Sequence, residues 1–206
     1  MQHESLSSRM AYLLGELRRE MNGAVVGSMR YYGKEYGLNY GVSIPTIRTI
    51  GRTYKDEHRF AKYLFEQQVR ELRLVSLWMA SAQSVGDELD FWAKGIVNSE
   101  VAEEAAFVCF KRVANIDSWL YQDDELLQYC ALLSLSGGTQ QGINHTQRIV
   151  ELLAQNPKLL PKAVVSYIEA SIKSGATKES ITAWLDELPD TPASSYIREE
   201  IRWRLE

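Results

Sequence analysis

The chain has 206 residues, of which 45% are hydrophobic and 24% are charged, and its net charge is −4. This composition suits one globular domain over residues 1–206, or a short repeat array with a continuous core, and requires no second domain. No charge-free apolar run approaches the roughly 18 residues of a membrane-spanning helix, and the first residues lack the order of a signal peptide. We therefore expect a cytoplasmic protein with no membrane partner.

Charge is distributed unevenly along the sequence. Residues 1–75 contain 12 Lys and Arg against 8 Asp and Glu, a net charge of +4, whereas residues 76–206 contain 11 against 19, a net charge of −8. The acidic total argues against a protein that coats nucleic acid indiscriminately. The basic amino-terminal third has two interpretations, an ordinary solvated surface or a contact area for nucleic acid.

Apolar residues recur at helical spacing along nearly the whole chain, and no run alternates strictly enough for a half-buried strand. We therefore predict an all-α fold. A first helix includes residues 13–17, and a second includes residues 25–29 and ends near Gly33. The segment Ser43-Ile44-Pro45 is typical of a helix cap followed by a proline in the first turn, so it predicts the start of a third helix.

Further helices are predicted over residues 60–65 and 72–79, and the second is apolar nearly all round, which indicates a central position. Asn98-Ser99 and Asp123-Asp124 each precede acidic residues in a first turn, where negative charge complements the helix dipole. Residues 137–142 are linker-like.

Four helices are expected after this linker, over residues 149–153, 160–172, 181–188 and 197–205. Asn156-Pro157 and Thr191-Pro192 are predicted to begin two of them, and Gly175 to end the longest.

Helix start signals near Asp56, Asn98 and Asn144 lie roughly forty residues apart, close to the period of helix-pair solenoids such as HEAT repeats. No sequence identity between the segments supports a repeat, and a globular helical bundle would show the same pattern. Spacing alone leaves both architectures open.

Residue patterns that carry chemistry are few. The histidines, His3, His58 and His145, are scattered, with no second histidine or cysteine at metal-ligand spacing, so we predict no metal site. No phosphate-binding or dinucleotide-binding loop is present, so we predict no cofactor. Cys109 and Cys130 lie in apolar helical stretches and are predicted to be buried, reduced thiols.

Adjacent carboxylates at Glu103 and Glu104 are candidates for acid–base work, although acidic residues near a helix start more often serve as solvated groups that complement the dipole. The five tryptophans have a similar pair of interpretations. They could stack on a nucleic-acid base, but core packing is expected for most of them.

A more specific pattern occupies residues 29–48. Residues 29–33, Met-Arg-Tyr-Tyr-Gly, end a helix in aromatic side chains, and residues 38–48, Leu-Asn-Tyr-Gly-Val-Ser-Ile-Pro-Thr-Ile-Arg, form a turn and a helix start. This pattern resembles the amino-terminal region of the bacterial DNA alkylation repair glycosylases of the AlkD type. Residues 69–72 and 122–128 are similar to two later segments of that family.

The resemblance implies a HEAT-like α-α superhelix of about 10–13 helices whose concave face holds duplex DNA. It therefore implies a protein that binds damaged duplex DNA. Candidate DNA-binding residues are the basic residues near the turn and helix start of residues 38–48 and in the middle of the chain, namely Lys34, Arg48, Arg52, Lys55, Lys111 and Arg112. Arg48 also lies in the Ser-x-Pro-x-x-Arg helix start of the family-like motif.

Three positions depart from the family pattern. The family's catalytic Trp-Trp-Asp-x-x-Asp stretch corresponds to residues 98–105, which contain no tryptophan and have Ala105 where the carboxylate would lie. Tyr129 stands where the family has an arginine in contact with DNA, and Glu169 stands where it has the arginine of a Trp-x-x-Arg helix.

Because of these departures, the resemblance predicts the family's fold but does not predict its base-excision activity. Base excision is left open, with Glu103 or Glu104 as a displaced carboxylate that could stabilise a cationic sugar. The alternative to DNA binding is an interaction scaffold that binds a protein or peptide on the concave face. No oligomeric state is predicted.

Overall fold

The computed structural model describes residues 5–31, 36–54, 57–138 and 143–205. Within these ranges the chain forms thirteen α-helices and two short 3-10 helices, and no strand. A single isolated bridge joins Leu38 and Val69 in parallel. The predicted all-α fold is confirmed. None of the described helices has the length and apolar character needed to cross a membrane.

Contacts between Cα atoms divide the chain into two compact units, residues 1–104 and 105–206. The first unit contains seven α-helices and the start of an eighth, namely α1 (Leu6–Arg19), α2 (Gly23–Tyr31), α3 (Ile44–Thr53), α4 (His58–Phe65), α5 (Arg70–Met79), α6 (Ala82–Gly86), α7 (Leu89–Ala93) and α8 (Ser99–Val108). The second unit contains the remaining elements, namely η1 (Phe110–Arg112), η2 (Ile116–Tyr121), α9 (Glu125–Ser136), α10 (Thr146–Ala154), α11 (Leu160–Lys173), α12 (Lys178–Glu187) and α13 (Pro192–Leu205).

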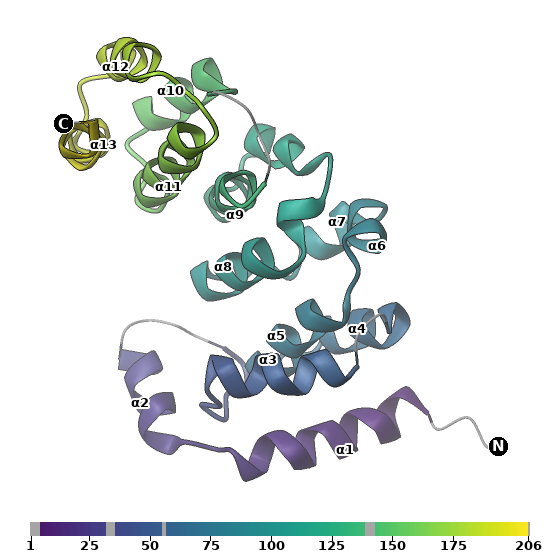
Figure 1. Ribbon diagram of the computed structural model, residues 1–206. Helices are drawn as coiled ribbons and strands as arrows, with labels where there is room; N and C mark the ends of the chain where they lie inside the picture. The colour runs from purple at the N-terminus through teal and green to yellow at the C-terminus, as the bar shows by residue number, and fades with distance from the viewer. Residues whose placement is uncertain (1–4, 32–35, 55–56, 139–142, 206) are drawn as a thin grey trace. The chain divides into compact units, whose positions relative to one another are not determined.

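Helix α5 forms the centre of the first unit, as its apolar sequence predicts. Helices α3 and α4 both pack against it (Figure 1). Its apolar side chains are completely buried on more than one face, at Leu72, Leu74, Val75, Leu77 and Met79. A helix that is apolar nearly all round must be covered on several sides to remove that surface from water.

In the second unit, α9 packs against α11, and α11 packs against α13 (Figure 1). Tyr129 on α9 is 6% exposed and belongs to this core. Cys109 and Cys130 are buried thiols, as predicted. Three of the five tryptophans are buried, at positions 92, 119 and 184.

Side-chain caps explain most helix starts. The Ser43 hydroxyl accepts a hydrogen bond from the Thr46 backbone N–H at 3.3 Å, and the Asp124 carboxylate accepts one from Leu126 at 2.8 Å. These bonds satisfy backbone donors that have no partner inside the helix.

One predicted start is wrong. Pro157 begins no helix, because Asn156 adopts a left-handed φ of 51° and α11 starts at Leu160, with Pro161 in its first turn.

Candidate functional site

The turn of the family-like motif is fixed by the first two residues of α5. The Glu71 carboxylate accepts hydrogen bonds from the backbone N–H groups of Tyr40 at 3.1 Å and Val42 at 3.2 Å. Arg70 donates to the Val42 carbonyl at 2.9 Å and to both oxygens of Glu100 at 2.7 and 2.9 Å. The Arg-Glu pair that resembles the family therefore has a structural task here, since it holds residues 40–42 against the start of α5.

This buried network contains one arginine between two carboxylates. Burial alone lowers the pKa of Arg70, but hydrogen bonds and charge from Glu100 and Glu71 outweigh it and raise that pKa. Burial, followed by the nearby charge of Glu100, raises the pKa of Tyr36, whose hydroxyl donates to Glu100. The arginine thus stays charged and the tyrosine stays neutral at physiological pH.

A second group of side chains, the Arg48–Glu104 cluster, consists of Arg48, Arg52, Trp78 and Glu104. Arg48 binds the Glu104 carboxylate through two parallel bonds of 2.9 and 3.0 Å, and the Trp78 indole donates to the same carboxylate at 2.6 Å. The Arg52 guanidinium lies 4.7 Å from the centre of the Trp78 ring. Glu104 is only 5% exposed, so this carboxylate is satisfied by its neighbours and largely shielded from water.

The cluster changes the interpretation of two sequence candidates. The bonds with Glu104 raise the pKa of Arg48, and the carboxylate neutralises the charge that a phosphate would otherwise meet. Glu103, one residue away, is exposed, so the two glutamates face opposite environments, in agreement with their helical spacing. No local sequence pattern indicates the cluster, because its members come from α3, α5 and α8.

Lys111 and Arg112 lie together in the second unit, on η1. They line a pocket of about 570 Å³. Its other walls come from Val113, Ala114 and Ile116, from Ser134 and Leu135 near the end of α9, and from Gly137 and Gly138 after it. The Lys111 ammonium lies 5.1 Å from the centre of the exposed Phe107 ring. Among residues that the structure describes, no carboxylate lies within 4.0 Å of Lys111 or Arg112. We call this the basic pocket.

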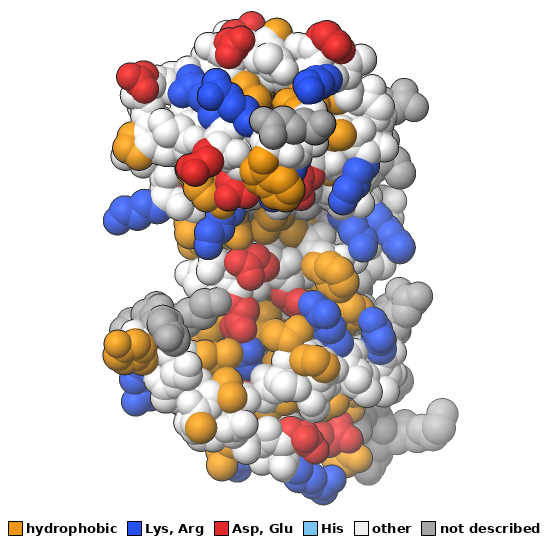
Figure 2. Space-filling view, turned by 60° about the vertical axis from the view of Figure 1, so that its left-hand side comes forward, with side chains coloured by type: hydrophobic (Ala, Val, Ile, Leu, Met, Phe, Trp, Pro, Cys, Tyr) orange, Lys and Arg blue, Asp and Glu red, His pale blue; other side chains and the backbone are white. Residues whose placement is uncertain are grey.

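Two further candidates, Lys34 and Lys55, lie outside the described residues. Glu169, which departs from the family pattern, pairs with Arg204 of α13. On the face drawn in Figure 2, Lys and Arg side chains are interspersed with Asp and Glu side chains. The described part of the chain contains no group of three or more His, Cys, Asp or Glu side chains arranged to hold a metal ion.

Comparison with known proteins gives a family and a fold. The sequence profile of the family described as DNA alkylation repair enzyme matches residues 13–168. One solved structure comes from a family described as related to the HEAT-like repeat DNA glycosylases with affinity for branched DNA structures. It superposes with a TM-score of 0.69 over 95% of each chain, at 13% sequence identity. At that identity the likeness concerns the fold, which is HEAT-like. No protein of curated function matches the sequence.

Proposed function

Because the chain belongs to the family of DNA alkylation repair enzymes, we propose that it binds duplex DNA through phosphate contacts, with Lys111 and Arg112 at their centre. The observation that carries this proposal is the basic pocket, where two adjacent cations have no carboxylate within ion-pair distance in the described structure. Each cation that neutralises a phosphate releases condensed counterions, which supplies most of the affinity of non-specific DNA binding.

Arg48 has a different role in this proposal. Its guanidinium already makes two bonds with Glu104, so contact with a phosphate would require it to leave a buried carboxylate without its charged partner. Arg52 is exposed beside it and remains a candidate phosphate contact. The Arg48–Glu104 cluster therefore holds α3 and Trp78 of α5 to Glu104 within the first unit, and the proposed phosphate contacts at the basic pocket belong to the second unit alone.

Base excision is the second candidate function, and one observation favours it. The Trp78 indole donates to the Glu104 carboxylate, which places an aromatic ring and a carboxylate together, the two residue types of the family's chemistry. The two bonds from Arg48 oppose it, because a carboxylate that is already neutralised stabilises a cationic sugar poorly. Release of methylated base that is abolished by Glu104→Gln but retained by Glu103→Gln would support excision.

Duplex binding is tested by fluorescence anisotropy with plain, methylated and four-way branched duplexes over a salt series. We expect affinity to fall linearly with the logarithm of salt concentration. The double variant Lys111→Gln/Arg112→Gln should make that slope shallower by about 2, since each phosphate contact contributes about 0.9.

The matched control is Lys158→Gln/Lys162→Gln, which removes the same charge from two exposed lysines of the second unit that do not line the basic pocket. Equal slopes for this control and the pocket variant would contradict the assignment of the pocket. No binding to any duplex at low salt would contradict DNA binding altogether and favour the protein-interaction scaffold.

A further inference from the structure

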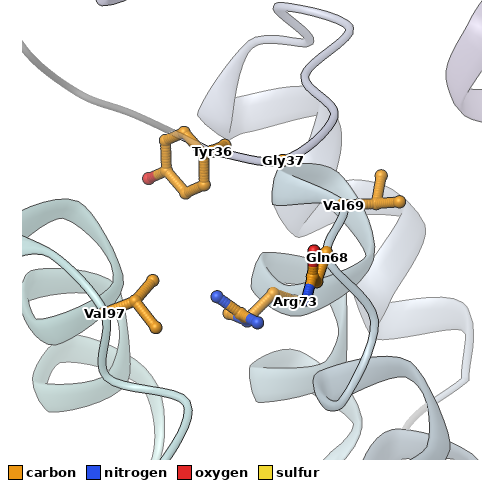
Figure 3. Close-up of a pocket in the computed structure, with 6 residues that line it drawn as sticks. All are labelled: Tyr36, Gly37, Gln68, Val69, Arg73 and Val97. Carbon is orange, nitrogen blue, oxygen red and sulfur yellow. The ribbon is translucent and has the colours of Figure 1, made fainter.

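A second pocket lies wholly within the first unit, apart from the residues assigned to DNA above. It has a volume of about 410 Å³ and is lined by Tyr36, Gly37, Gln68, Val69, Arg73 and Val97. Figure 3 shows the Arg73 guanidinium directed into the space bounded by Tyr36 and Val97. We call this the Arg73 pocket. Its volume falls in the range of small-molecule sites, roughly 300–1,000 Å³.

The backbone of this pocket is fixed. The Leu38 N–H donates to the Gln68 carbonyl at 2.8 Å, and the Arg70 N–H donates to the Leu38 carbonyl at 2.9 Å. A Cβ atom at Gly37 would lie 2.6 Å from the Gln68 carbonyl oxygen, so glycine is needed for this close approach. Because these walls are already held in place, a ligand that binds here does not bear the entropic cost of ordering them.

Arg73 is the charged group among the described residues that line the pocket. Its Nε and one Nη donate to the Phe65 and Gln67 carbonyls at 3.2 and 3.3 Å, and the other Nη has no acceptor among the residues described. No described carboxylate lies within 4.0 Å of this guanidinium, and burial lowers the pKa of Arg73. A half-buried cation with only neutral acceptors gains from an added anion.

The other side chains that line the pocket and the charges near it indicate which kind of anion it would bind. Tyr36 offers an aromatic ring whose hydroxyl is held by Glu100 and Asn98, Val97 offers an apolar side chain that is 45% exposed, and Gln68 offers an amide. Arg70, Glu71, Glu100 and Arg73 together carry no net charge, so each further negative charge in the pocket meets repulsion from the two carboxylates. A singly charged group therefore suits this pocket better than a doubly charged one.

We propose that the Arg73 pocket binds one unpaired nucleotide of a nucleic-acid strand, with the base against Tyr36 and Val97 and the singly charged phosphodiester on Arg73. Bases stack on aromatic side chains without regard to sequence, and a guanidinium recognises phosphate oxygens well. This inference extends the proposed DNA binding to a second, separate site. It concerns an extruded or overhanging nucleotide, whereas the basic pocket concerns the duplex backbone.

The probe is a deoxydinucleoside monophosphate, which carries one phosphodiester and no duplex, titrated into protein with ¹³C-labelled valine methyl groups. We expect saturable shifts of the Val69 and Val97 methyl signals. A free nucleoside 5′-phosphate, which is doubly charged, should bind more weakly. Absence of shifts at both valines would overturn the proposal, as would tighter binding of the free nucleotide.

Two variants of Val97 place opposite charges at the rim of the pocket while both remove the same apolar side chain, so the difference between them reports on charge. Val97→Asp should weaken dinucleotide binding by about threefold and Val97→Lys should strengthen it by a similar factor, monitored at Val69. Effects in the same direction would contradict the role of charge. Arg73→Gln should weaken binding at least about tenfold, because a charge-assisted contact is lost.

The proposals for the two DNA sites can be contradicted independently of each other. A duplex with a single-nucleotide bulge should bind more tightly than the fully paired duplex, and Arg73→Gln should remove only this difference. The variant Lys111→Gln/Arg112→Gln should weaken both duplexes equally. Dinucleotide shifts without duplex binding would refute the proposed function alone, and duplex binding without the bulge preference would refute the Arg73 pocket alone.

Discussion

Arg48 shows how much the role of a single residue depends on its partner. In sequence it is a cation at a helix start that resembles a DNA-binding family, and in the structure its guanidinium binds a carboxylate that is 5% exposed. A buried charge that loses its partner costs more than the pair contributes, because the remaining charge is left poorly solvated. The stability of the first unit should therefore depend on this residue.

We expect Arg48→Gln to lower the free energy of unfolding by about 1–3 kcal/mol, since Glu104 keeps one neutral donor, the Trp78 indole. Urea unfolding followed by circular dichroism measures this loss. The double variant with Glu104→Gln should lose less than the sum of the single variants, because the two charges act together. Arg52→Gln is the control and should cost at most about 1 kcal/mol, as it removes only an exposed contact with the same ring. If the double variant lost as much stability as the two single variants together, the result would contradict energetic coupling between Arg48 and Glu104.

At the scale of elements, the packing of α3 on α5 depends on a glycine. A Cβ atom at Gly51 would lie 2.4 Å from the Cβ atom of Trp78, and neither atom belongs to a flexible side-chain end. We expect Gly51→Ala to destabilise the protein by about 1–3 kcal/mol through overpacking. Gly15→Ala in α1 is the matched control, because nothing lies within 4 Å of its added methyl group. That change should stabilise the protein by up to about 1 kcal/mol. Thermal unfolding of both variants checks the prediction, and a Gly51→Ala protein as stable as wild type would contradict the close contact.

The longer elements could be predicted from the sequence because apolar period and capping residues agree. Ser43 and Asp124 cap α3 and α9, and the apolar run of residues 72–79 is the buried α5. The short helices α6 and α7 were not predicted, since five residues are too few to show a helical period. The prediction at Pro157 is wrong because a proline after an αL residue also suits a loop, and α11 starts three residues later, at Leu160.

The candidate sites of the whole molecule were less predictable than its elements. Trp78 and Glu104 lie 26 residues apart, and Arg48 and Glu104 lie 56 residues apart, so no local pattern connects them. The Arg73 pocket is likewise built from three separate segments, around residues 36, 70 and 97. Lys111 and Arg112 are candidates from the sequence as basic residues in the middle of the chain. Lack of a nearby carboxylate, which distinguishes them from Arg48, is a property of the fold and not of the sequence.

The buried thiols of the second unit make global stability depend on pH in a definite direction. Burial raises the pKa of Cys130 from 9.0 to about 12, and it raises the pKa of Cys109 as well. Above pH 9 the unfolded chain releases both protons while the folded chain keeps them, so alkali favours the unfolded state. Stability from these groups is fully present below pH 9 and is lost as pH rises toward the folded pKa, by about 1.4 kcal/mol per pH unit for each thiol. Urea unfolding between pH 7 and 10.5 under a phosphine reductant measures the slope. The variant Cys109→Ala/Cys130→Ala should be less stable than the wild type at pH 7, because the smaller side chains leave cavities. Above pH 9 it should lose stability more slowly with rising pH, because it has no thiols to ionise. Parallel curves of stability against pH for the two proteins would contradict protonated thiols in the folded state.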